Sequence, residues 1–455
     1  MPPSLGRFGD ARREAAGIDL LARLVEVGQS GVSVRGLGGD RSGEVRFGRF
    51  LHCEAVTPGE MVAAASAHTH GRVAGRHILA IQDTTSLRDD GKQRSINLHP
   101  TIAVDAKDGG LLGLVHAELL LRDGSAAEVH CNKRPFTEKE SHRWLAATQA
   151  SALLRASGAQ AVTVVGDREG DIYEEFALRP PEVEVLFRAH HDRLLSDGES
   201  LFRKPDGWTE LGRETITLPA APGRRKRKVM LALRAGLVAL KRPKRNSAAE
   251  AAKLPATVTV TLVEVREVDP PADTEPVLWR LLTSHPVETL AAARQMTGFY
   301  RQRWIIEQLF RTMKTKGFDI EAVRVAEGGP FENLAIATLI AAIEVLSLVR
   351  DRDGAVGQPM TDVFEADEQP IIAAIGASLE GRSPRQRNPH APASLAHAAW
   401  VCARLGGWTG YYGKPGPVVM LQGLLRLQAM IEGWRLVSQA MAPPSKQPAK
   451  TTALQ

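Results

Sequence analysis

The sequence predicts an α/β fold built on a mixed β-sheet, with a β-rich insertion in the core and helical segments at both ends. Two observations lead to this prediction. Apolar runs of strand type at residues 78–82 and 161–166 each end in an aspartate, and a helical pattern lies between them. A later helical pattern, over residues 299–314, carries a glutamate. The chain has 455 residues, enough for about two to four domains.

The first half of the core follows a definite order of elements. A strand ends at Asp83 and is followed by two strand-like runs, 101–105 and 111–121, around a Lys-Asp-Gly-Gly turn. A helix is expected over 138–157, and then a second strand ends at Asp167. Ligands gather beyond the carboxyl ends of strands in an open sheet, so the two carboxylates are placed to share a site. This order is that of a ribonuclease-H-like core, which needs a third acid on a later helix.

Residues 183–285 are expected to form a β subdomain inserted into that core, with two basic runs, 224–228 and 241–245, on its loops. Its expected strands cover residues 183–188, 229–233, 237–241, 257–268 and 279–284. The predicted domains are an N-terminal helical domain (1–70), the first part of the core (71–182), the insertion (183–285), the second part of the core (286–350) and a C-terminal helical region (351–455).

The bulk composition is that of a cytosolic protein with a mild positive charge. The net charge is +6, and the two basic runs suit a polyanion, although solvated loops would carry them equally well. Three scattered cysteines without CxxC spacing argue against disulfides or a zinc site. No signal peptide is apparent, and the apolar run 334–348 is short for a bilayer span, so we expect a buried helix and a cytoplasmic protein without a membrane partner.

The third acid is Glu307, in the helix predicted over residues 299–314. At helical spacing Tyr300, Arg303, Glu307 and Lys314 fall within roughly 60° of one another. The opposite face is apolar, with Trp304, Ile305, Leu309 and Met313. Ordinary ion pairs within the helix are the alternative explanation of the polar stripe.

Phosphodiesters can be cut by two-metal chemistry, and the three acids suit this reaction. The predicted catalytic residues and metal ligands are Asp83, Asp167 and Glu307. Two hard cations stabilise the attacking and the leaving oxygen of such a reaction. Mg²⁺ prefers oxygen ligands and keeps several waters, so a few carboxylates suffice to hold it. Arginine and lysine on the same helical face would grip neighbouring phosphates. The aromatic rings of Tyr300 and Trp279 would stack on an unpaired base, with core packing as the alternative for Trp279.

Three motifs in this order resemble the DDE transposases of insertion-sequence family four, the group that contains the transposase of transposon five. Residues 80–86, Ala-Ile-Gln-Asp-Thr-Thr-Ser, resemble the strand with the family's first catalytic Asp. Residues 166–173, Gly-Asp-Arg-Glu-Gly-Asp-Ile-Tyr, resemble its Asp-Arg-Glu-x-Asp segment. The Tyr-x2-Arg-x3-Glu-x6-Lys signature is matched by Tyr300, Arg303, Glu307 and Lys314.

The resemblance extends over nearly the whole chain. It implies a ribonuclease-H-like fold, Mg²⁺ (replaceable by Mn²⁺) and a homodimer that holds two transposon ends. It further implies double-stranded DNA as partner, both terminal inverted repeats and target, and cleavage through a hairpin with a flipped base. One departure from the family is that the chain begins close to Phe8-Gly-Asp10, without some residues that relatives place before this segment. The expected DNA contacts are Tyr300, Arg303, Lys314, Trp279, Arg188 and Arg49.

The sequence is also compatible with other functions. An inactive DNA-binding inhibitor or domesticated relative is one, although an intact set of three acids argues against it because clustered carboxylates repel one another. A ribonuclease-H-like nuclease that cuts without joining strands is another. A phosphatase acting on small molecules is a weaker candidate, because extended positive surface would serve it no purpose.

Overall fold

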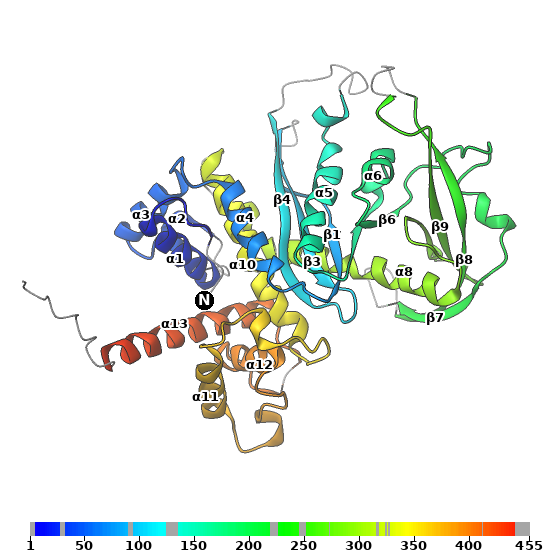
Figure 1. Cartoon of the computed structure of the whole chain (residues 1–455). Helices are drawn as coiled ribbons and strands as arrows, with labels where there is room; N and C mark the ends of the chain where they lie inside the picture. The colour runs from blue at the N-terminus through cyan, green and yellow to red at the C-terminus, as the bar shows by residue number, and fades with distance from the viewer. Residues whose placement is uncertain are drawn as a thin grey trace, which may run out of the picture.

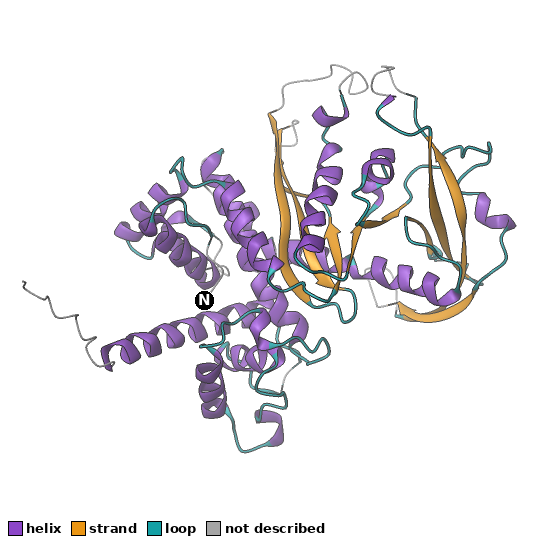
Figure 2. Ribbon diagram, in the orientation of Figure 1, coloured by secondary structure: helices purple, strands orange, loops and turns teal. Residues whose placement is uncertain are grey.

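The computed structural model describes residues 5–27, 32–89, 94–123, 135–218, 226–244, 252–272, 274–314, 318–323, 325, 328–411 and 413–441. Figure 1 shows a β-sheet with helices on its faces and, beside it, a helical region. That region joins both ends of the chain, because α1 packs on α10 and α13. The strands lie together on one side of the molecule, with helices on the faces of the sheet and a helical region beside it (Figure 2).

The strands of the described residues form one large sheet. In chain order they are β1 (His77–Gln82), β2 (Thr85–Asp89), β3 (Arg94–Asp105), β4 (Leu111–Asp123), β5 (Ala161–Gly166), β6 (Glu184–Arg188), β7 (Gly212–Leu218), β8 (Arg227–Lys241), β9 (Thr257–Glu267) and β10 (Leu278–Thr283). Their order in the sheet is β2-β3-β1-β5-β6-β10-β9-β8-β7, and β4 pairs with β3.

The centre of the sheet has the topology expected of the core. β4, β3 and β1 are antiparallel neighbours, whereas β5 and β6 run parallel to β1. The order β4-β3-β1-β5-β6 is consistent with a ribonuclease-H-like fold. The predicted hairpin is confirmed as β3–β4, although both strands are longer than expected.

Strand β1 is buried on both faces, which explains its continuous apolar sequence. Leu79 and Ile81 belong to one core cluster, together with residues of helix α8. Ile78 and Ala80 belong to the other cluster, together with Trp144 of helix α5. Helices therefore cover both sides of the strand that ends at Asp83.

The longer helices are α1 (Ala11–Val27), α3 (Arg41–Leu51), α4 (Pro58–His70), α5 (His142–Ala156), α8 (Leu290–Gln302), α9 (Trp304–Met313), α10 (Gly329–Asp351), α11 (Gln369–Leu379), α12 (Leu395–Leu405) and α13 (Pro417–Met441). Short helices are α2 (Val34–Gly38) and α6 (Tyr173–Leu178). Helix α5 begins four residues later than predicted, after the 3-10 turn Phe136–Glu138.

The single helix predicted over residues 299–314 is wrong. The structure has two helices, α8 and α9, with a break at Arg303. The break is a tight turn: Arg303 N–H donates to the Tyr300 carbonyl, and Ile306 N–H donates to the Arg303 carbonyl, both i to i+3. Lys314 lies just past the end of α9. Trp304, predicted to be apolar packing, is instead 48% exposed.

The strands of the predicted insertion extend the same sheet, because β10 pairs with β6 and β9 with β10. Two of its predicted strands, 229–233 and 237–241, are halves of the single strand β8, and β7 was not predicted. Residues 224–225 and 245 of the basic runs lie outside the described residues. Arg227, Lys228 and Lys241 belong to β8, so the prediction of basic loops is wrong for these three.

Helix α10 is long and apolar enough to cross a membrane by length and composition, but 89% of its apolar window is buried inside the protein. It contacts α1, α3, α4, α9, α12 and α13. This agrees with the predicted buried helix, since a helix that is apolar all round needs neighbours on every side.

Candidate active site

Asp83 and Asp167 follow the carboxyl ends of adjacent parallel strands. The last paired residues of β1 and β5 are Ile81 and Val165, so each aspartate lies two residues past the ladder. The backbone N–H of Thr84 donates to Asp83 Oδ1 at 2.8 Å, and that of Glu169 donates to Asp167 Oδ1 at 2.8 Å. The sheet topology therefore brings together two residues that are far apart in the sequence.

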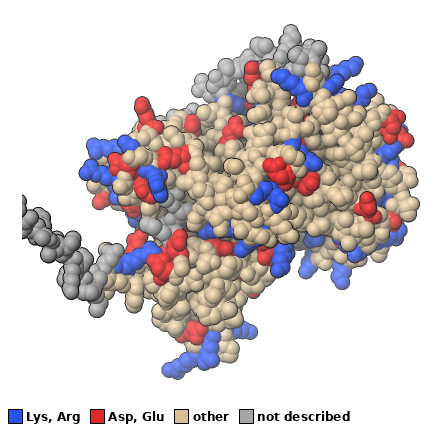
Figure 3. Space-filling view, viewed as in Figure 1, with Lys and Arg blue, Asp and Glu red and all other residues tan. Residues whose placement is uncertain are grey.

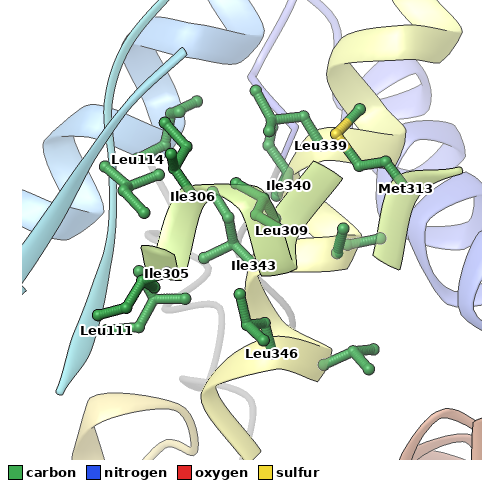
Figure 4. Packing of buried hydrophobic residues seen from close by; sticks show 14 of the residues in the cluster. Leu111, Leu114, Ile305, Ile306, Leu309, Met313, Leu339, Ile340, Ile343 and Leu346 are labelled. Atoms are coloured by element: carbon green, nitrogen blue, oxygen red, sulfur yellow. The ribbon is translucent and has the colours of Figure 1, made fainter. Parts of the chain in front are cut away.

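Glu307 reaches the same place because the opposite face of α9 is buried. Ile305, Ile306 and Leu309 pack against α10 and β4 (Figure 4). The partners shown are Leu339, Ile340, Ile343, Leu346, Leu111 and Leu114. Apolar packing thus fixes the rotation of α9, and the polar face that carries Glu307 is directed toward Asp83.

Arg303 connects the first and the third acid. Its Nη1 lies 2.8 Å from Asp83 Oδ2, and its Nη2 lies 2.5 Å from Glu307 Oε1. The break between α8 and α9 puts this guanidinium at the start of α9. One cation therefore bridges two of the three carboxylates.

Asp83 is largely buried, and its pKa responds to the charges of both other acids. The pKa of Asp83 is raised to about 7, mainly by burial and next by the charge of Asp167, while Arg303 and the Thr84 N–H act in the opposite direction. Glu307 also raises the pKa of Asp83. A carboxylate that is destabilised by burial and by two like charges is stabilised by an added cation.

The donor chemistry of the three acids fits Mg²⁺ or Mn²⁺, which prefer carboxylate oxygens. Within the described residues, however, no group of three His, Cys, Asp or Glu side chains is close enough to form a ready metal site. The guanidinium of Arg303 lies between Asp83 and Glu307 and pairs with both. Metal binding by both acids would require the guanidinium to move aside.

Three of the predicted DNA contacts gather beside a cavity of about 840 Å³. Trp279 and Arg188 line it, together with Arg168, the residue that follows Asp167. Tyr300 is buried and packs edge-on against Trp279, with ring centroids 5.7 Å apart. An aromatic ring among arginines is a suitable environment for an unpaired nucleotide.

The other predicted contacts lie elsewhere. Lys314 Nζ is 2.7 Å from Glu321 Oε1, an ion pair that the sequence did not indicate. Arg49 is exposed on α3, in the helical region rather than near the sheet (Figure 1). On the face shown in Figure 3, basic and acidic side chains are interspersed and form no single basic stripe.

Sequence reasoning missed the polar side chains that surround the two strand ends. These are Gln82, Thr84, His99, Arg143 and Glu169. Thr84 and Glu169 lie inside the motifs, so their positions next to the acids were a signal. His99 and Arg143 are isolated in the sequence and carried no signal of their own.

The mixed sheet, with acids at the ends of adjacent strands, is consistent with a ribonuclease-H-like α/β fold. Residues 134–343 match the family model described as the transposase DDE domain. The match includes Asp167 and Glu307, and it begins after Asp83. It supports a DDE transposase family for this chain. That family implies DNA as substrate, and its enzymes generally use divalent metal ions.

Proposed function

We propose that this protein is a cut-and-paste DNA transposase in which Asp83, Asp167 and Glu307 bind two Mg²⁺ ions. The observation that carries the proposal is the position of Asp83 and Asp167 at the ends of adjacent parallel strands, with Glu307 joined to Asp83 through Arg303. The match to the transposase DDE domain supports the general class. The finer assignment to insertion-sequence family four rests on the sequence motifs.

The bound metal ions would supply an activated water or hydroxyl and neutralise charge on the phosphate under attack. The residues of the chain have separate tasks. The two aspartates follow adjacent parallel strands, so the sheet brings their carboxylates to the same edge. Arg303, released from Asp83 and Glu307, would bind a phosphate of the scissile strand. Trp279 would stack on the flipped base in the cavity beside Arg168 and Arg188.

The remaining parts of the proposal concern the DNA and the assembly. A hairpin on the transposon end would form before the end is joined to target DNA, and a homodimer would hold both ends. The helices α1 to α4, with Arg49 exposed on α3, would bind the terminal inverted repeat. The apolar side chains exposed near the end of α13, Met430, Trp434, Leu436 and Val437, suit the proposed dimer contact. The protein would act in the bacterial cytoplasm.

The experiment is cleavage in vitro of DNA that carries the element's own ends, with Mg²⁺ and with EDTA. Wild-type protein is compared with Glu307→Ala and with Glu182→Ala, a matched removal of an exposed acid just before β6. We expect Mg²⁺-dependent cutting with a hairpin intermediate, lost in Glu307→Ala and kept in Glu182→Ala. Equal cutting by Glu307→Ala would refute the assignment of the third acid. Tight binding without cutting by the wild type would indicate an inactive DNA-binding relative, and cutting without joining would indicate a nuclease.

A further inference from the structure

The imidazole of His99 contacts both residues that flank Asp83. His99 lies on β3 and is fully buried. Its Nδ1 is 2.9 Å from Thr84 Oγ1, and its Nε2 is 3.0 Å from Gln82 Oε1. Gln82 and Thr84 precede and follow Asp83 in the chain. One rigid ring thus holds the strand end on both sides of the first acid.

The directions of these hydrogen bonds follow from a neighbouring guanidinium. Arg143 Nε donates to Thr84 Oγ1 at 3.2 Å. A guanidinium can only donate, so the hydroxyl hydrogen of Thr84 is free to donate to His99 Nδ1. His99 Nε2 then carries the proton and donates to Gln82 Oε1. His99 is therefore the neutral Nε2–H tautomer, and burial together with the charge of Arg143 lowers its pKa well below the ordinary value.

The bond pattern continues beyond Gln82 into the core. The Gln82 amide nitrogen donates to Thr148 Oγ1 at 3.2 Å, and both side chains are fully buried. His99 also packs edge-on against Trp144, with ring centroids 4.7 Å apart. Thr148 and Trp144 both belong to α5, so the turn at Asp83 is fastened to the helix that covers this face of the sheet.

Arg143 also reaches the turn of the second acid. Its Nη2 donates to Glu169 Oε2 at 2.9 Å. Glu169 N–H in turn donates to the carboxylate of Asp167, as Thr84 N–H does to that of Asp83. A continuous set of hydrogen bonds therefore runs from the Asp83 carboxylate, through Thr84, Arg143 and Glu169, to the Asp167 carboxylate.

This connection adds to what the sheet supplies. The paired register of β1 and β5 ends at Ile81 and Val165, two residues before each aspartate. Beyond that point each strand still pairs with its other neighbour: Asp83 N–H donates to the Pro100 carbonyl of β3 at 3.4 Å, and Gly166 pairs with Phe187 of β6. The described link between the two acid turns themselves runs through the side chains around Arg143.

We infer that His99 and Arg143 are positioning residues, which hold the carboxylates of Asp83 and Asp167 at a fixed separation and orientation for the reaction. The inference rests on the proposed function and deepens it, because it names what holds the first two acids in place. Residues that orient metal ligands through hydrogen bonds typically contribute about 10- to 100-fold to metal affinity or activity.

The test uses two substitutions of Thr84 that differ in one group. Thr84→Val removes the hydroxyl at nearly constant volume, and Thr84→Ser keeps it. We expect Thr84→Val to reduce the single-turnover cleavage rate at saturating Mg²⁺ by about 10- to 100-fold, with unchanged affinity for end DNA, and Thr84→Ser to cut near the wild-type rate. If the hydroxyl of Thr84 served stability alone, Thr84→Val would lose thermal stability but would cleave at the wild-type rate.

A second measurement tests Arg143 and the direction of the bonds. Arg143→Lys keeps the charge but cannot contact Thr84 and Glu169 together as the guanidinium does, so it should also slow cleavage without weakening DNA binding. The ¹⁵N NMR shifts of the His99 ring in the metal-free protein should show a neutral Nε2–H tautomer. An Nδ1–H or charged ring would overturn the bond pattern.

The failures of the two proposals are distinguishable. If the wild type cuts and Asp167→Ala does not, but Thr84→Val and Arg143→Lys cut at full rate, the positioning role is refuted and the proposed function stands. If the wild type neither cuts end DNA nor binds Mn²⁺ in calorimetry, the proposed function and the positioning role are refuted together.

Discussion

The substitution Asp83→Asn should stabilise the metal-free protein at neutral and alkaline pH. Burial and the charges of Asp167 and Glu307 raise the pKa of Asp83 from 3.8 to about 7. The folded protein therefore holds this proton more tightly than the unfolded chain does. As the pH rises through the range between these two values, the free energy of unfolding falls, and asparagine escapes that loss.

The size of the effect follows from the pKa shift. A shift of about 3 units corresponds to about 4 kcal/mol, of which about 2–3 kcal/mol falls between pH 5 and pH 8. The Asp83 side chain is only 14% exposed, so solvent screening reduces this little. The ion pair between ionised Asp83 and Arg303, which asparagine cannot form, opposes this change, but its effect is already included in the pKa of about 7. The quantity to compare is therefore the free energy of unfolding of the variant minus that of the wild type, and how this difference changes with pH.

The assay is urea unfolding in EDTA, followed by tryptophan fluorescence at about pH 5 and about pH 8. From about pH 5 to about pH 8, the free energy of unfolding of Asp83→Asn should rise by about 2–3 kcal/mol relative to that of the wild type. Glu140→Gln is the control, because Arg122 holds the pKa of Glu140 below its ordinary value and no change is expected in this range. The electrostatic account of the site would be refuted if the difference in the free energy of unfolding between Asp83→Asn and wild type stayed constant or shrank as the pH rose.

Three further predictions concern the surroundings of the acids. A Cβ at Gly166 would lie 2.5 Å from Phe187, so Gly166→Ala should lower the free energy of unfolding, measured with urea, by about 1–3 kcal/mol. It should also slow end cleavage by displacing the aspartate that follows. Unchanged stability would contradict the close packing. Trp279→Ala should weaken binding of DNA with an unpaired base by about 1–3 kcal/mol relative to fully paired DNA, and equal losses for both DNAs in fluorescence titrations would argue against stacking. Lys314→Ala should lower the salt dependence of DNA binding by about one unit of slope; an unchanged slope in filter binding would mean that Lys314 contacts Glu321 and no phosphate.

The sequence alone determined the elements that carry the acids. The apolar runs before Asp83 and Asp167 could be recognised because strands buried on both faces need continuous apolar sequence. Glu307 could be recognised because the apolar side of its helix has helical spacing, and the structure uses that side for packing on α10. The order of elements along the chain was sufficient to predict the central sheet.

The tertiary structure decided what lies between those elements. The break at Arg303 was not predictable, because Arg303 fits a helix by propensity and its contacts with Asp83 and Glu307 are visible only in the packed chain. The roles of His99 and Arg143 depend on partners that are distant in the sequence, and the same holds for the continuous sheet across β6 and β10. Local periodicity reports which face of an element is buried, but only the packed chain determines which polar side chains meet beyond the ends of the strands.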